Sequence, residues 1–166
     1  MKLQKKGMKF LRTFHILTAS IWFGGVICIG VIVRICFFSL DESAFLIVAP
    51  LVPSLYSTVI MPVGLLIILQ GIVYGCFTGW GFFKHRWITL KWVSLVLVML
   101  CTGMGAIGQM FSAIEKVKAQ GLNGGFADGG IVLLFIVLQS LFLAFMIAIS
   151  VYKPALNKNK LIKTDS

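Results

Sequence analysis

Four long apolar segments dominate the sequence and decide the environment in which it can fold. They run over residues 13–38, 54–79, 87–112 and 130–152. A hydrocarbon core of about 30 Å is crossed by about 20 helical residues, so each segment is long enough to span a bilayer. Hydrophobic residues make up 59% of the 166 positions, which is more apolar surface than a soluble domain of this size buries. We therefore expect an integral membrane protein.

The segments are predicted to be helices of one bundle. Backbone groups in lipid must be hydrogen-bonded within their own segment, and the alternation typical of a membrane β-barrel is absent. The first segment follows a basic stretch, as an export signal does, but its apolar run exceeds the about 7–15 residues of such a signal. The sequence therefore predicts an all-α, four-helix membrane bundle formed by a single domain over residues 1–166.

The charged residues alternate between the two ends of this predicted bundle. The N-terminal arm, the link between the second and third segments, and the C-terminal tail are all basic. The other two loops hold Asp41, Glu42, Glu115 and Asp128. This positive-inside pattern predicts that both termini are cytoplasmic, in a multi-pass protein of a bacterial-type inner membrane. The net charge of +10 then reflects orientation and attraction to anionic lipid headgroups, and no nucleic-acid partner is expected.

Two ionisable residues near the predicted cytoplasmic side stand out as candidate functional groups. His15 lies three residues past Arg12, about 4–5 Å into the first helix at about 1.5 Å per residue. Lys91 lies five residues past Arg86, about 7–8 Å into the third helix by the same rise. Ionisable groups within a membrane are costly and often functional. Because both helices start from the same side, the two residues can line one site.

Helical spacing places further polar groups on the faces that carry these two residues. The face of the first helix holds His15, Thr18, Trp22 and Gly25. The face of the third helix holds Lys91, Ser94, Val98, Thr102, Gly105 and Gln109. Gln70 and Gln139 each add an amide near the middle of the membrane. A bundle with such faces has a polar interior or a bound cofactor, and we expect Trp22 and Ser94 to contact that cofactor.

Several of these features also have ordinary structural explanations. A lysine near a helix end can extend its ammonium to the headgroups, and a shallow histidine can bond a headgroup or a neighbouring helix. The cysteines are scattered singly without a CxxC motif, so we expect neither a zinc site nor a disulfide framework. We interpret His85 as a solvated residue of the short link, and the helix glycines as packing positions. Pro62 is expected to kink or loosen the second helix.

If His15 is a metal ligand, haem b is the natural group for it to hold. Neutral imidazole binds haem iron, and a four-helix bundle can hold a planar macrocycle between its helices. Lys91 is then either the second axial ligand or the partner of a haem propionate. Other conceivable sixth ligands are Met61, Met99, Met104 and Met146, although methionine at helical spacing is usually a core residue.

Two motifs carry a resemblance to a known superfamily. The first is the opening of the first helix, FLRTFHILTASIWFGG, and the second is the start of the third helix, RWITLKW. Both resemble a superfamily of small four-helix membrane proteins that includes HemJ-type protoporphyrinogen oxidases, CopD-type copper-resistance domains and uncharacterised membrane proteins. In the HemJ-type enzymes, the first-helix histidine and third-helix lysine are implicated in haem b binding and activity. The resemblance implies these roles for His15 and Lys91.

From the residues and the resemblance together, we expect a haem b-binding membrane redox protein. Its activity would be electron transfer or HemJ-like oxidation of a porphyrin substrate, protoporphyrinogen IX, with a quinone or another membrane carrier taking the electrons. A homo-oligomer is compatible with this reading. Two alternatives stay open. One is a transporter or copper-handling protein whose polar face lines a pathway without haem, and the other is an accessory membrane subunit whose polar residues join it to a partner.

Overall fold

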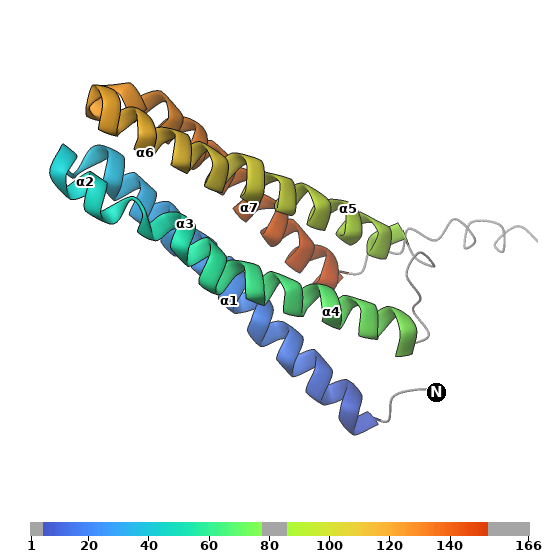
Figure 1. Cartoon of the computed structure of the whole chain (residues 1–166). Coiled ribbons are helices and arrows are strands. Elements are labelled where there is room, and N and C mark those ends of the chain that lie inside the picture. Colours follow the sequence, from blue (N-terminus) through green and yellow to red (C-terminus); the bar gives the residue numbers. More distant parts are fainter. Residues whose placement is uncertain (1–4, 78–85, 153–166) are drawn as a thin grey trace, which may run out of the picture.

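The computed structural model describes residues 5–77 and 86–152, and all of its regular structure is helical. In chain order the elements are α1 (Lys5–Phe38), α2 (Glu42–Val48), α3 (Leu51–Leu55), the π-helical segment η1 (Tyr56–Ile60), α4 (Met61–Phe77), α5 (Arg86–Leu100), the π-helical segment η2 (Cys101–Ile107), α6 (Gly108–Gln120) and α7 (Leu122–Tyr152). Together they form an elongated bundle, shown in Figure 1.

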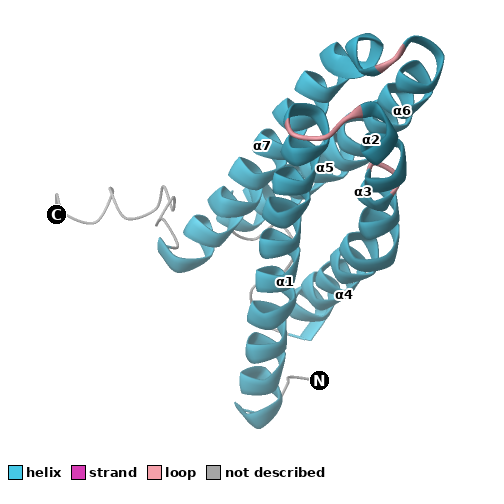
Figure 2. Cartoon of the chain, turned by 90° about the vertical axis from the view of Figure 1, so that its left-hand side faces the viewer, coloured by secondary structure: helices cyan, strands magenta, loops and turns pink. Residues whose placement is uncertain are grey.

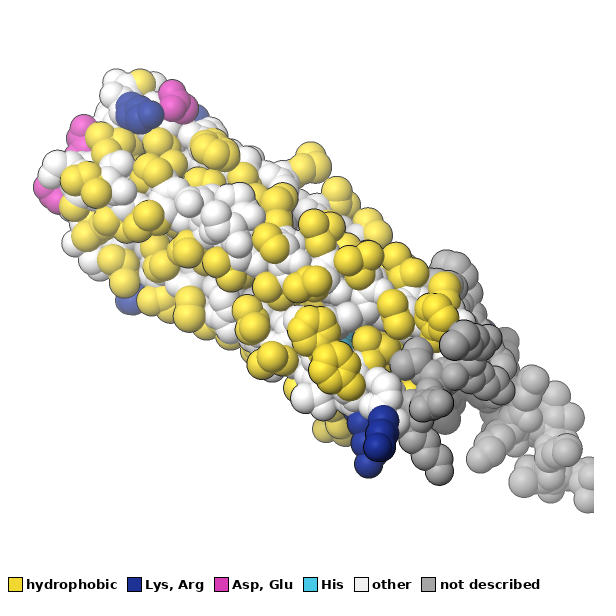
Figure 3. Space-filling model, turned by 60° about the horizontal axis from the view of Figure 1, so that its bottom comes forward, with side chains coloured by type: hydrophobic (Ala, Val, Ile, Leu, Met, Phe, Trp, Pro, Cys, Tyr) yellow, Lys and Arg dark blue, Asp and Glu magenta, His cyan; other side chains and the backbone are white. Residues whose placement is uncertain are grey.

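Four continuous helical stretches are long and apolar enough to cross a membrane. They are Lys6–Phe38, Glu42–Phe77, Arg86–Gln120 and Leu122–Tyr152. The all-α prediction and the prediction of a multi-pass membrane protein are confirmed. In Figure 3 hydrophobic side chains cover the length of the bundle, and acidic side chains gather at the end that carries α2 and the start of α7. The side of the membrane on which each terminus lies stays a prediction from the charge pattern.

The charge pattern placed Asp128 in a loop before the fourth segment, and this was wrong, because residues 122–130 form the start of α7. The chain turns at Gly121, whose φ is 75°, and α7 begins at the next residue. The glycines here allow close helix packing instead. A Cβ at Gly125 would lie 2.5 Å from the Val117 side chain, and one at Gly129 would lie 2.6 Å from the Phe37 ring.

Two membrane-length helices each contain a π-helical segment. In η1 the Met61 N–H bonds the Tyr56 carbonyl, five residues back. Pro62 follows directly, and because proline has no N–H it leaves the carbonyl four residues back without its usual partner. The loosening expected from Pro62 therefore takes the form of a π turn. In η2 the Gly108 N–H bonds the Gly103 carbonyl in the same way, and no proline marks this segment in the sequence.

The order of packing around the bundle is α4, α1, α7 and α5. The long helix α7 packs along both α1 and α5, and α4 packs along α1. At the end away from the start of α1, the short helices α2 and α3 contact α6; this end is viewed in Figure 2. By contrast, α4 and α5 approach each other only locally, as where a Cβ on Gly71 would lie 3.6 Å from the Trp92 ring. The side of the bundle between α4 and α5 is therefore the least tightly packed.

Candidate functional site

His15 is held by an amide from a neighbouring helix. Its Nδ1 lies 2.8 Å from Oε1 of Gln70 on α4. Thr18, one turn along α1, also reaches this oxygen, with its hydroxyl 3.3 Å away. Both Gln70 and Thr18 are buried, with exposed fractions of 4% and 3%. The packing of α4 along α1 thus brings one histidine, one amide and one hydroxyl into a small polar cluster, which we call the His15 cluster.

One aromatic ring packs against the His15 cluster, and a second lies against Lys91. The Tyr74 ring stands edge-on to the His15 ring, with 5.9 Å between centroids and an interplanar angle of 82°. Tyr74 follows Gln70 by four residues, so the two lie on one face of α4. From α5, Lys91 places its ammonium 5.3 Å from the centroid of the Trp87 ring, within the range of a cation–π contact.

The structure brings His15 and Lys91 into the same region, as their similar depth predicts. The charge of Lys91 acts on the His15 imidazole, although the two side chains come from separate helices. Ser94, one turn further along α5, is buried with an exposed fraction of 4%. No described contact joins Ser94 to His15, so its cofactor role stays a prediction. His85 lies outside the described residues.

Trp22 lies deeper in the bundle than the His15 cluster. It is seven residues past His15 on the same helix, which corresponds to about 10 Å along the axis. With an exposed fraction of 2%, it borders a cavity of about 60 Å³ whose other walls come from both π-helical segments and their neighbours. The lining residues are Trp22, Ile60, Met61, Gly64, Met99, Thr102 and Gly103. The structure thus places Trp22 away from His15, beside a cavity that Thr102 also lines.

A buried hydrogen-bonded network crosses the bundle next to this cavity. The Tyr56 hydroxyl donates to Oε1 of Gln139 at 3.0 Å, and Nε2 of Gln139 donates to the Thr102 hydroxyl at 2.8 Å. Thr102 in turn donates to the carbonyl of Val98 at 2.9 Å. The sequence singled out Thr102 and Gln139 as polar residues but missed Tyr56. The network joins η1, α7 and η2.

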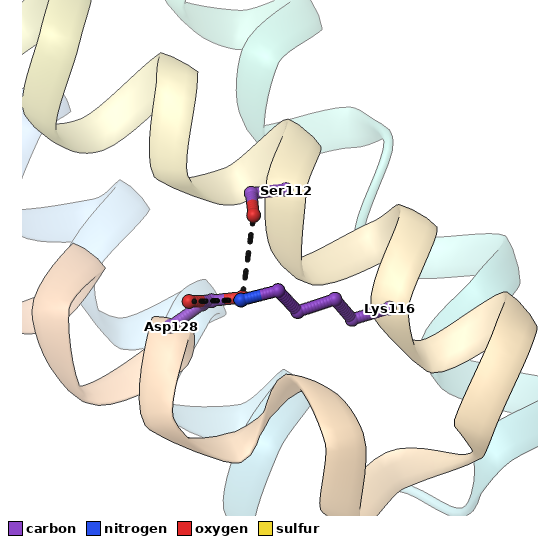
Figure 4. Close-up of polar contacts among 3 residues, drawn as sticks. All are labelled: Ser112, Lys116 and Asp128. Carbon is purple, nitrogen blue, oxygen red and sulfur yellow. Dashed lines mark hydrogen bonds and ion pairs between the residues drawn. The ribbon is translucent and has the colours of Figure 1, made fainter.

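A second polar cluster, absent from the sequence-based predictions, lies in the α6–α7 hairpin. Asp128 is buried, and its carboxylate oxygens lie 2.9 Å and 3.0 Å from Nζ of Lys116. The Ser112 hydroxyl lies 3.4 Å from the same carboxylate, as Figure 4 shows. A buried carboxylate is costly unless it is paired, and Lys116 and Ser112 on α6 supply the partners of Asp128 on α7. Arg34, which lies within the first apolar segment and which we did not single out, is exposed on α1.

The contact with Gln70 determines what His15 can do chemically. An amide oxygen can only accept, so in this arrangement Nδ1 carries the proton and donates it to Oε1. The lone pair of the other ring nitrogen, Nε2, is then available to a metal ion. A histidine that donates its second N–H to an oxygen is the usual arrangement of metal-binding imidazoles. Nε2 of Gln70 itself is buried without a hydrogen-bond partner among the described residues.

This donor set fits haem better than a metal held by several side chains. Among residues 5–77 and 86–152, no three His, Cys, Asp or Glu side chains come together as a metal site. Haem iron, whose four equatorial ligands come from the porphyrin, can be held by a single imidazole. If haem is bound here, His15 with its Gln70 partner would supply that one ligand, and Lys91 would supply a positive charge suited to a propionate.

Comparison of the chain with protein-family models, curated proteins and solved structures gave no match. The superfamily resemblance of the two helical motifs therefore remains an expectation from the sequence.

Proposed function

We propose that this membrane protein binds haem b through Nε2 of His15 and acts in electron transfer. The observation that carries the proposal is the 2.8 Å contact between Nδ1 of His15 and Oε1 of Gln70. It fixes the ring orientation and leaves the second nitrogen available. When bound, haem supplies a one-electron redox centre.

The residues around His15 have separate roles in this proposal. Gln70 holds the imidazole, Thr18 bonds the same amide oxygen of Gln70, and the Tyr74 ring packs against the His15 ring. Lys91 pairs with a propionate, because a protonated ammonium has no lone pair for iron and suits a carboxylate. The alternative role of Lys91 as second axial ligand requires it to lose its proton.

The finer activity that we propose is HemJ-like oxidation of a porphyrinogen on the side predicted to be cytoplasmic. The dianionic porphyrin substrate would meet the basic residues expected on that side. A lipid-soluble carrier such as a quinone would receive the electrons, because the bundle lies within the bilayer.

The test is the visible spectrum of the detergent-purified protein, oxidised and then reduced with dithionite. We expect a b-type spectrum that is lost in His15→Ala and kept in His85→Ala, the matched control at the only other histidine. Lys91→Met should retain the spectrum if Lys91 is the propionate partner and change its ligation bands if Lys91 is an axial ligand. A protein that stays colourless when produced with ample haem would refute the proposal and favour the transporter or accessory-subunit alternative.

A further inference from the structure

The amide of Gln70 has unequal surroundings at its two ends. Oε1 is close to two potential donors, His15 Nδ1 at 2.8 Å and the Thr18 hydroxyl at 3.3 Å. Nε2 is buried and has no partner among the described residues. A buried amide nitrogen without an acceptor is unfavourable. The arrangement that frees Nε2 of His15 is therefore one in which the amide itself is only half satisfied.

Reversal of this amide keeps both of its contacts. The terminal torsion of glutamine is broad and roughly two-fold, and its oxygen and nitrogen have similar size. After a half-turn, Nε2 of Gln70 would stand where Oε1 stands and would donate to Nδ1 of His15. It could also donate to the Thr18 hydroxyl, because that hydroxyl has its own acceptors in the carbonyls of Phe14 at 3.0 Å and His15 at 3.1 Å.

The two amide orientations require opposite tautomers of His15. With Oε1 facing the ring, the proton is on Nδ1 and Nε2 is a free acceptor. With the amide nitrogen facing the ring, Nδ1 must accept a hydrogen bond, so the ring proton is on Nε2. In that tautomer Nε2 has no lone pair and cannot bind a metal. We propose that Gln70 is a two-state positioning residue whose amide orientation decides whether His15 can bind a metal. The metal-binding part of this inference rests on the proposed function, whereas the coupling between amide and tautomer does not.

A bound ligand would bias this equilibrium. In the ligating state the outward group of Gln70 is a donor, so a ligand that places an acceptor beside it stabilises that state. In the closed state the outward group is an oxygen, which water or another donor stabilises. A ligand can shift an equilibrium only through such a difference between its contacts in the two states. Ligand binding is therefore expected to shift His15 toward the tautomer whose Nε2 lone pair is free to bind a metal.

Nitrogen NMR can test the coupling without any haem. In a His85→Gln protein labelled with ¹⁵N-histidine, His15 gives the only imidazole signals, since the chain has two histidines. At about pH 9, where an ordinary imidazole is neutral, protonated and unprotonated ring nitrogens have well-separated shifts. We expect both tautomers in the Gln70 protein and the Nδ1–H form alone in Gln70→Glu, whose carboxylate only accepts. A single tautomer in the Gln70 protein that Gln70→Glu leaves unchanged would overturn the inference.

A haem titration of the same proteins separates this inference from the proposed function. We expect Gln70→Glu to bind haem at least as tightly as the unchanged protein, and the isosteric Gln70→Met to bind it about 10–100-fold more weakly. If no protein binds haem while the tautomers shift as expected, the proposed function fails and the switch stands. If all bind haem equally and the tautomer never changes, the switch fails and the proposed function stands. Thr18→Val keeps the Gln70 amide and removes only the Thr18 hydroxyl, so both tautomers should remain detectable. This variant is used in place of Gln70→Met if Gln70→Met misfolds.

Discussion

Replacing Gly105 by alanine should damage the bundle far more than a single methyl group normally does. A Cβ at Gly105 would lie 2.2 Å from Cγ and 2.8 Å from Cβ of Phe135 on α7. Carbon atoms in ordinary contact are about 3.5 Å apart or more, so the two must separate by roughly 1.3 Å. Because the clash includes the Cβ of Phe135, turning the ring cannot relieve it, and the helix backbones must move apart.

The size of the effect follows from two opposing contributions. Forcing an extra methyl group into a packed interior costs typically about 1–3 kcal/mol, and alanine recovers up to about 1 kcal/mol over glycine through helix propensity. Separation of η2 from α7 would also stretch the bond between Gln139 and Thr102. We expect the free energy of unfolding to fall by about 1–2 kcal/mol. This value is the cost of the extra methyl group, minus the gain in helix propensity, plus the cost of the weakened bond.

The same segment contains a matched control, because a Cβ at Gly103 would meet nothing within 4 Å. Unfolding by SDS titration from mixed micelles, followed by tryptophan fluorescence, measures both variants. Gly103→Ala should be neutral or slightly stabilising. If Gly105→Ala proves as stable as Gly103→Ala, the helices leave room for a Cβ at Gly105, and the predicted clash with Phe135 is refuted.

Three further changes have defined outcomes. Gln139→Leu removes both bonds of the buried network and should lower the free energy of unfolding by about 1–2 kcal/mol, given an average of about 0.6 per membrane hydrogen bond; no change in SDS titration would contradict this. Lys116→Met leaves the Asp128 carboxylate buried without its ammonium partner and should lower the free energy of unfolding by about 1–3 kcal/mol. The loss is smaller than for a fully buried pair because Lys116 is half exposed. The double variant with Asp128→Asn should recover part of this loss. The Ser43 hydroxyl and then the Ala44 N–H lower the pKa of Asp41 from its usual 3.8. The cap on α2 should therefore persist at neutral pH and be lost only as the pH falls through that lowered value, with faster amide exchange in α2 that Asp41→Asn does not show.

The sequence predicts the helices well and their ends poorly. Lipid imposes a minimum apolar length, so composition alone indicated four spanning helices. The stretch before the fourth segment was misread because glycine and Asp128 usually mark a loop. Here glycine allows α7 to approach its neighbours, and Lys116 neutralises the aspartate, so the helix continues. Neither compensation is visible without knowing which residues face each other.

The sequence predicted how deep in the membrane the residues of the candidate site lie, but not which residues contact each other. Similar distances from the basic helix ends were enough to predict that His15 and Lys91 lie in one region. Which amide reaches His15 depends on the rotation of α4 about its own axis. That rotation depends on η1, where a hydrogen bond reaches five residues back instead of four. The wider turn changes the direction in which every later side chain of α4 points. For this reason Gln70 could be named as a polar residue but not as the partner of His15, and Tyr56 was missed altogether.

The packing of α1 along α7 has a consequence for how the protein is made. Membrane segments are synthesised in sequence, so α1 and α5 enter the bilayer before α7, which packs along both of them, exists. Until α7 arrives, the Tyr56 hydroxyl lacks its acceptor on Gln139, and the Thr102 hydroxyl lacks the Gln139 donor and keeps only its bond to the Val98 carbonyl. A chain halted before α7 should therefore be a substrate for membrane-protein degradation, with a shorter lifetime in a pulse-chase experiment than the full chain; equal lifetimes would contradict this. The arrival of α7 would then complete the hydrogen-bonded network that joins η1 and η2.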